Sequence, residues 1–279
     1  MTDTPRVPLQ GNIALSTVIP GVETSVAALI AGGGNDINSK LLLHFDGDDG
    51  AAVFNDSSRF AHPVIAHNVT TSSANAKFGK TSVRFNGTAS PGYLQLDGSA
   101  DFAFGSGNFT IEFWLRLNVL GVIGIIYDPR PIGSGGGVPV IYYLTDNKIR
   151  YLTDGADRII ATNPLVAGQW YHIAVVRTGT NTTKLFIDGV QTGSTFVDNT
   201  VYINNANRPV IGMDGSDLIN YTINAWIDEL RVSNIARWTK NFTPPALAYY
   251  DDNATIITAD ADEPIIVIDD DRTNSVSAS

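Results

Sequence analysis

The sequence predicts an all-β protein, built as a two-sheet sandwich or a barrel, with a short arm at each end. Short apolar runs recur between turn residues, and 26 glycines and 13 prolines punctuate the chain. Residues 109–118 alternate apolar and polar side chains with a period of two, which is typical of a strand with one face in a core. Strands and helices do not alternate along the sequence, which argues against a parallel α/β sheet.

Charge and residue content exclude several classes of protein. The net charge is −10, but residues 251–279 hold eight acidic residues and one arginine, so the rest of the chain is nearly neutral. Without a basic stripe, nucleic-acid binding is not expected. The chain has no cysteine, which excludes disulfides, thiolate metal sites and thiol nucleophiles. The apolar stretch near the N-terminus is broken by Ser16, Pro20 and Glu23, so neither a signal peptide nor membrane insertion is expected.

Changes in composition divide the chain into three segments. Residues 1–38 read as an attachment or oligomerisation arm with a short helix at 26–30 and a glycine-rich linker; the alternative is a disordered arm. Residues 39–250 carry the dense strand signals of a single body. Residues 251–279 form an acidic tail with β-prone runs, which either adds a strand to a neighbour's sheet or stays solvated.

Within the body, the apolar runs and turns predict a series of short strands. The expected strands are 41–45, 51–54, 80–86, 93–97, 109–118, 122–127, 140–144, 149–152, 170–177, 184–188, 210–213 and 224–232. The dipeptide Asp188-Gly189 predicts a two-residue type I′ turn, because both central positions of that turn need positive φ. His172 lies in an apolar run and reads as a core histidine.

Several phrases of this sequence, in their order and spacing, resemble the laminin-G-like, concanavalin A-like lectin/glucanase domains. The phrases are LLLHFDGDDG, AKFGKTSVRFNG, FGSGNFTIEFWLRL, GQWYHIAVVR, KLFIDGV and WIDELRVSNIARW. They are similar to the variety found in bacteriophage tail-fibre and virion surface proteins, and they span roughly residues 39–250. The resemblance implies an antiparallel jelly-roll sandwich. It leaves function open, because this fold hosts lectins, hydrolases, lyases and structural spacers.

No catalytic site is expected. The retaining hydrolases of this superfamily carry acidic residues at alternate strand positions, so that two carboxylates face the sugar. Here Asp228 and Glu229 are adjacent and would point to opposite faces, and Glu112 is the distant partner that such a mechanism would require. The four histidines lie in neither an HExxH nor a GxSxG motif.

A calcium site is a further expectation, because Ca²⁺ prefers carboxylate and carbonyl oxygens gathered from turns. The resemblance adds that calcium-binding members use acids at the start and end of the domain. The candidate ligands are Asp46, Asp48, Asp56 and Asp228. The alternative is that the first three cap turns.

A carbohydrate site is expected where aromatic rings and planar polar groups share one sheet, because sugars stack on rings and bond to such groups. The candidates are Trp114, Tyr127, Arg130, Tyr142, Tyr143 and Tyr151. The alternative is that these side chains are packing residues.

Together with these residues, the resemblance implies a non-enzymatic surface protein of a phage or phage-like particle, assembled in the host cytoplasm and acting outside the cell. We expect a homo-oligomer that contacts other virion proteins through residues 1–38 and binds host surface glycan, with multivalency compensating for weak sites. The alternatives are a structural capsid-decoration or fibre spacer and, less favoured, a polysaccharide depolymerase.

Overall fold

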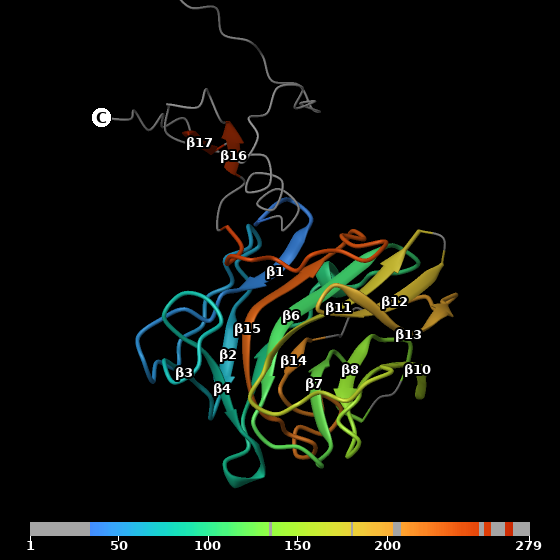
Figure 1. Ribbon diagram of the computed structural model, residues 1–279, viewed down its shortest axis with the longest axis horizontal. Helices are drawn as coiled ribbons and strands as arrows, with labels where there is room; N and C mark the ends of the chain where they lie inside the picture. Colours follow the sequence, from blue (N-terminus) through green and yellow to red (C-terminus); the bar gives the residue numbers. More distant parts are fainter. Residues whose placement is uncertain are drawn as a thin grey trace, which may run out of the picture.

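The computed structural model describes residues 34–133, 136–179, 181–202 and 208–250, together with the backbone of two further strands, 254–257 and 266–269. The described body is a sandwich of two antiparallel sheets, one of eight strands and one of seven (Figure 1). The predicted jelly-roll sandwich is therefore confirmed. The predicted helix at 26–30 and most of the two arms lie outside the described residues.

The eight-stranded sheet has the central strand β6 (Phe109–Leu117) between β11 and β15. Its order is β13 (Val190–Val197), β12 (Thr182–Ile187), β11 (Trp170–Thr178), β6, β15 (Asn224–Ser233), β4 (Ser82–Asn86) and β3 (Thr70–Ser72), with β1 (Ser39–Leu43) also paired to β15.

The seven-stranded sheet packs against the inner face of the first. Its order is β10 (Ala156–Ile160), β9 (Ile149–Thr153), β8 (Val140–Tyr143), β7 (Gly124–Asp128), β14 (Val210–Ile211), β5 (Tyr93–Leu96) and β2 (Val64–His67). Two single-turn 3₁₀ helices, η1 (Gly87–Ala89) and η2 (Ala100–Phe102), and a separate hairpin of β16 (Ala254–Ile257) and β17 (Ile266–Asp269) complete the described elements. No helix among them has the length and hydropathy to cross a membrane.

Alternation along the strands places the core between the two sheets. Phe109, Ile111 and Phe113 of β6 are fully buried and belong to the main apolar cluster, as the period-two pattern predicts. The predicted turn is also confirmed, since Asp188 and Gly189 have φ values of 50° and 74°. The predicted strand at 51–54 is wrong, because the sheet ladder does not include it and Ala51 bonds instead to Asp48 and Thr71.

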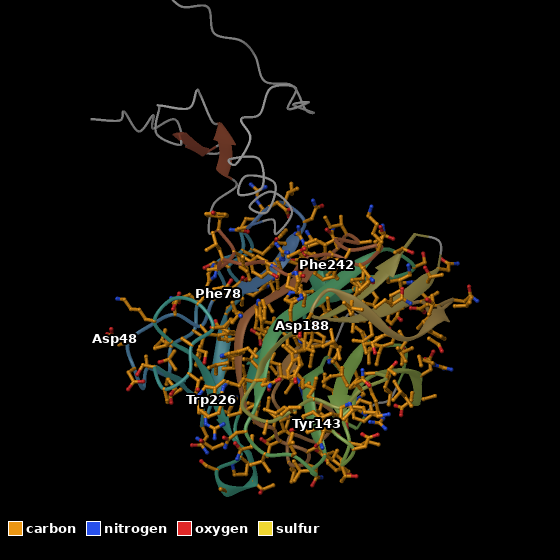
Figure 2. The ribbon with its side chains drawn as sticks, in the orientation of Figure 1. Asp48, Phe78, Tyr143, Asp188, Trp226 and Phe242 are labelled. Atoms are coloured by element: carbon orange, nitrogen blue, oxygen red, sulfur yellow. The ribbon has the colours of Figure 1, made fainter. Side chains whose placement is uncertain are left out.

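The outer face of the eight-stranded sheet is covered at one end by the strap, which we define as residues 234–250. Trp238 of the strap stacks on Phe242 with ring centroids 3.9 Å apart, and both pack on an apolar cluster that includes Phe186. The N–H of Phe242 donates to the carbonyl of Gly189 at 2.9 Å, which fastens the strap to the β12–β13 turn. Figure 2 labels Phe242 near this covered end and Trp226 towards the other end of the sheet.

A β-bulge in β15 separates these two ends. The pairing of β15 with β6 shifts register between Asp228 and Arg231, and Glu229 has a φ of 50°. On its other edge, β15 pairs with β4 before the bulge and with β1 after it. The bulge thus lets two different strands share one edge of β15.

Both ends of the described body lie beside β1, at the covered end of the sheet. The N–H of Asn35 donates to the carbonyl of Tyr250 at 2.8 Å, and Gly34 packs directly on Tyr250. The chain therefore enters and leaves the body at one pole, while Trp226 lies ~20 Å away along β15 if the strand rise is ~3.3 Å per residue.

Candidate functional site

Three of the tyrosines predicted to bind carbohydrate lie inside the sandwich. Tyr127, Tyr143 and Tyr151 are each 0% exposed and belong to the main core cluster. Burial raises the pKa of each phenol, and the hydroxyl of Tyr151 bonds to that of Tyr202. Their rings present no face at the surface of this structure.

Trp114 lies on the outer face of the eight-stranded sheet, but it is 6% exposed. The ammonium of Lys77 lies 3.9 Å from its ring centroid, and the rings of Phe78 and His172 contact it edge-on. A loop and its neighbours thus cover the indole face on which a sugar would stack.

The other two predicted residues lie on or beside the seven-stranded sheet and already have partners. Arg130 forms a bidentate pair with Asp128 and a second ion pair with Asp214 at 3.1 Å. Tyr142 is half-buried and donates to the carboxylate of Asp157. The six predicted carbohydrate-binding side chains therefore do not share one surface.

Three of the four aspartates predicted to bind calcium, Asp46, Asp56 and Asp228, accept hydrogen bonds from protein donors. Asp56 is 8% exposed and accepts four hydrogen bonds, from the N–H groups of Leu42, Ser58 and His62 and the hydroxyl of Ser58. In effect it organises the turn that follows β1, which is the alternative role considered from the sequence.

Asp46, Asp48 and Asp228 differ in their burial and in their hydrogen-bond partners. Asp46 accepts from the N–H of Lys80 at 2.8 Å, and the side chain of Asp48 is exposed. Asp228 is fully buried, and burial raises its pKa to about 8, although three backbone N–H groups bond to its carboxylate. In the described residues no three acidic or imidazole side chains are arranged to hold a metal ion, so the four aspartates do not fit a shared calcium site.

Glu112, the distant carboxylate that a two-acid mechanism would need, is 0% exposed. It accepts from Arg231 at 2.6 and 2.9 Å and from the indole N–H of Trp238 at 2.6 Å. The ion pair and the strap shield this carboxylate from any substrate at the surface.

Sequence reasoning missed a cluster on the uncovered end of the same outer face, which we call the polar patch. Its members occupy adjacent rows of three neighbouring strands and include two guanidiniums, three amides and one indole. They are Arg84, Asn86, Arg116, Asn118, Asn224 and Trp226.

The strand register builds the patch. Trp226 of β15 pairs with Arg84 on one side and with Arg116 on the other, and the next row holds Asn224 opposite Asn86. The guanidinium carbons of Arg84 and Arg116 lie 4.0 and 5.2 Å from the Trp226 ring centroid. The indole thus keeps the two cations apart, with their Cα atoms ~10 Å from each other across two strand spacings.

Hydrogen bonds hold the amides of the patch in place. Asn224 accepts from the amide of Asn118 at 3.0 Å and from Arg84 at 2.8 Å, and its own amide donates to the carbonyl of Asn86 at 3.4 Å. Asn86 and Asn118 are exposed. Fixed planar groups with spare donors and acceptors suit the hydroxyls of a sugar.

Trp170 gives the patch an aromatic neighbour. It pairs with Arg116 from β11, is partly exposed, and stacks on no other ring or cation among the described residues. Trp170 therefore offers the aromatic surface for sugar stacking that the buried Trp114 does not.

Two hollows lie nearer the arms. One, of about 380 Å³, is lined mainly by Lys40, Asp101, Phe104, Asn108 and Asn234. The other, of about 340 Å³, is lined by His44, Phe45, Asp46, Phe54, Asn55 and Tyr249, among others. None of the predicted carbohydrate residues lines either hollow.

A family model for the concanavalin A-like lectin/glucanase superfamily matches residues 86–240, more than half of the chain. The chain belongs to this superfamily. The matched region holds five of the six patch residues and Trp170, and it ends within the strap. The predicted family is thereby confirmed.

Solved structures share this superfamily fold at low sequence identity. The binding domain of Paraclostridial Mosquitocidal Protein 1 has 16% identity and a TM-score of 0.56, covering 71% of this chain and 49% of that one. The binding domain of botulinum neurotoxin serotype C1 has 17% identity and a TM-score of 0.54, covering 71% and 49%.

A further similar structure comes from botulinum neurotoxin type C, whose cell entry depends on interaction with two ganglioside molecules. It has 15% identity and a TM-score of 0.54, and covers 71% of this chain and 48% of that one. This chain thus spans about half the length of these structures, and the likeness establishes the fold. A search of curated proteins found no match.

Proposed function

We propose that this protein is a non-enzymatic carbohydrate-binding component of the surface of a phage or phage-like particle, and that it binds host cell-surface glycan. The observation that carries the proposal is the polar patch beside Trp170, which combines fixed amides and guanidiniums with a partly exposed aromatic ring. One structural neighbour is a toxin whose cell entry depends on interaction with two ganglioside molecules, and gangliosides carry glycan headgroups, which supports the proposal.

The position of the patch suits display on a particle. Both ends of the described body lie at one pole, beside β1, and the patch lies on the far part of the sheet. We propose that residues 1–38 contact other virion proteins and that the protein is a homo-oligomer. Several copies held side by side would then compensate for a weak affinity per patch.

Glycan-array binding by the full-length chain tests this function. We expect Trp170→Ala to weaken binding several-fold, because one aromatic stacking contact contributes about 0.5–1.5 kcal/mol. Asn118→Ala should also weaken binding, because it removes an exposed amide of the patch. Both variants should keep the wild-type melting temperature, since both side chains lie at least partly in solvent.

Tyr142→Ala is the matched control, because Tyr142 is an aromatic residue of similar exposure on the other sheet. Unchanged glycan binding by this variant supports the patch. Binding lost with Tyr142→Ala and retained with Trp170→Ala would instead support the residues chosen from sequence. Failure of the wild type to bind any glycan would favour the structural spacer, and release of reducing ends from a polysaccharide would favour a depolymerase.

A further inference from the structure

The polar patch carries positive charge that no carboxylate of the described residues neutralises. Arg84 and Arg116 form no ion pair there, whereas Arg130, Arg150 and Arg231 each pair with a carboxylate. Two unpaired guanidiniums on one face stand out in a chain with 28 acidic and 18 basic residues.

Neutral groups hold one of these cations in position. The guanidinium of Arg84 donates to the carbonyls of Phe85 and Ala225 and to the amide oxygen of Asn224, at 3.1 Å for Ala225 and 2.8 Å for Asn224. Burial lowers its pKa, which means that its surroundings disfavour the positive charge. A nearby anion would offset that penalty, because an opposite charge favours the charged form.

The second cation keeps its donors available. Arg116 makes no hydrogen bond or ion pair with any described residue, and its guanidinium carbon lies 5.2 Å from the centroid of the Trp226 ring. Guanidiniums bind carboxylates and sulfates through two parallel N–H bonds, so Arg116 is suited to an oxyanion.

The indole that both guanidiniums approach carries a donor without an acceptor. Trp226 is 8% exposed, and its indole N–H finds no acceptor among the described residues. A buried donor without an acceptor is destabilising, so an acceptor supplied by a ligand would be favourable.

The carboxylate nearest to Trp226 along β15 already accepts hydrogen bonds from the backbone. Asp228 is held by the backbone N–H groups of Lys77, Phe78 and Glu229 beneath a loop. Lys77 itself lies over Trp114 without an acidic partner, and it adds a third cation to the same face.

We propose that the polar patch is specific for an acidic saccharide, whose carboxylate or sulfate binds between Arg84 and Arg116 while its ring stacks on Trp170. This inference rests on the proposed carbohydrate-binding function and adds the charge of the ligand. A nucleic acid is a poorer fit, because the body lacks the extended basic stripe that a phosphate backbone requires.

Calorimetric titration of the full-length protein with matched polymers tests the charge. Polygalacturonate and its methyl ester differ in the carboxylate, and dextran sulfate and dextran differ in the sulfate. We expect at least tenfold tighter binding of the acidic member of at least one pair, with an affinity that falls as salt rises. The pair that shows the difference identifies the oxyanion.

Arg116→Gln should weaken acidic binding at least tenfold, weaken neutral binding much less, and leave the melting temperature unchanged. Arg158→Gln is the matched control, because Arg158 lies on β10 of the other sheet and also has no ion pair among the described residues. Equal binding of acidic and neutral polymers would overturn the charge inference while the carbohydrate function stands. Binding of neither class would overturn both, and tighter binding of single-stranded DNA than of any polymer would overturn the saccharide as ligand.

Discussion

Replacing Glu112 with glutamine tests how the strap is fixed over the outer face. The carboxylate of Glu112 is fully buried and accepts from Arg231 and Trp238, so it joins β6, β15 and the strap. Burial alone disfavours the charged form, yet the positive charge of Arg231 brings the pKa of Glu112 below its usual value. The pair is therefore ionised in the folded protein at neutral pH.

The size of the destabilisation follows from the buried charge of Arg231, which remains in the variant. Glu112→Gln keeps an oxygen that the Trp238 indole can use, but it leaves the fully buried Arg231 guanidinium without its counter-charge. Breaking a buried ion pair in this way costs about 3–5 kcal/mol. This is a large part of the stability of a typical domain, which is about 5–15 kcal/mol.

Urea unfolding followed by tryptophan fluorescence measures the loss, with the denaturant slope as a check that the folded state is unchanged. The double variant Glu112→Gln with Arg231→Met is the control, because it removes both charges and should recover most of the lost stability. A loss below about 1 kcal/mol for the single variant, or a double variant less stable than the sum of the singles, would refute the reasoning.

Three further predictions concern pH, the strap and metal. Burial lowers the pKa of His172 to about 4. As pH falls below about 6.5, His172 is protonated in the unfolded chain but stays neutral in the folded protein, so the free energy of unfolding decreases. His172→Gln should therefore reduce the loss of unfolding free energy between pH 7 and 4.5 by about 2–3 kcal/mol; parallel profiles for the two proteins would contradict this. Gly189→Ala should lower the melting temperature more than Gly155→Ala. Both positions have positive φ, so both substitutions strain the backbone. A Cβ at position 189 would also lie 1.9 Å from the carbonyl oxygen of Phe242, whereas a Cβ at position 155 meets nothing within 4 Å. Adding EDTA should leave the melting temperature unchanged, since Asp46, Asp56 and Asp228 already accept hydrogen bonds from the protein; a lower midpoint would support the calcium prediction.

The sequence predicted the sandwich because its strand periodicity is a local signal. Alternation in β6 and the Asp188-Gly189 turn depend on neighbouring residues alone, and both are confirmed. The strand at 51–54 was wrongly predicted, because a short apolar run does not reveal whether a partner edge is available. There the backbone carbonyl of Ala51 accepts a hydrogen bond from the N–H of Thr71 in β3, but the run does not continue as a strand.

Which carbohydrate candidates lie at the surface was harder to predict, because periodicity gives a strand two faces without saying which face is covered. In β8 and β9, Tyr143 and Tyr151 alternate with Tyr142 and Leu152, and both sets are largely apolar. The eight-stranded sheet packs on one face of β8 and β9, and this packing buries Tyr143 and Tyr151 together with Ile141.

The polar patch depends on register across strands that are distant in sequence. Arg84 and Asn224, which share a hydrogen bond, are separated by 140 positions. A local trace of the patch does exist, because Arg84 and Asn86 repeat the spacing of Arg116 and Asn118. Two strands with arginine and asparagine on one face become a site once β15 lies between them.

The bulge at Glu229 connects the covered and uncovered ends of the outer face. After the bulge, Arg231 pairs with Glu112 beneath the strap, and the carboxylate of Glu229 accepts from the Tyr249 N–H at the strap's end. Before the bulge, Trp226 meets two arginines without any carboxylate. β15 thus places a buried, ion-paired arginine at the pole where the described body begins and ends. At the opposite pole it places an indole between two arginines that have no ion pair among the described residues. Loss of the Glu112–Arg231 pair should consequently lower stability while the affinity of the remaining folded protein for its ligand stays unchanged.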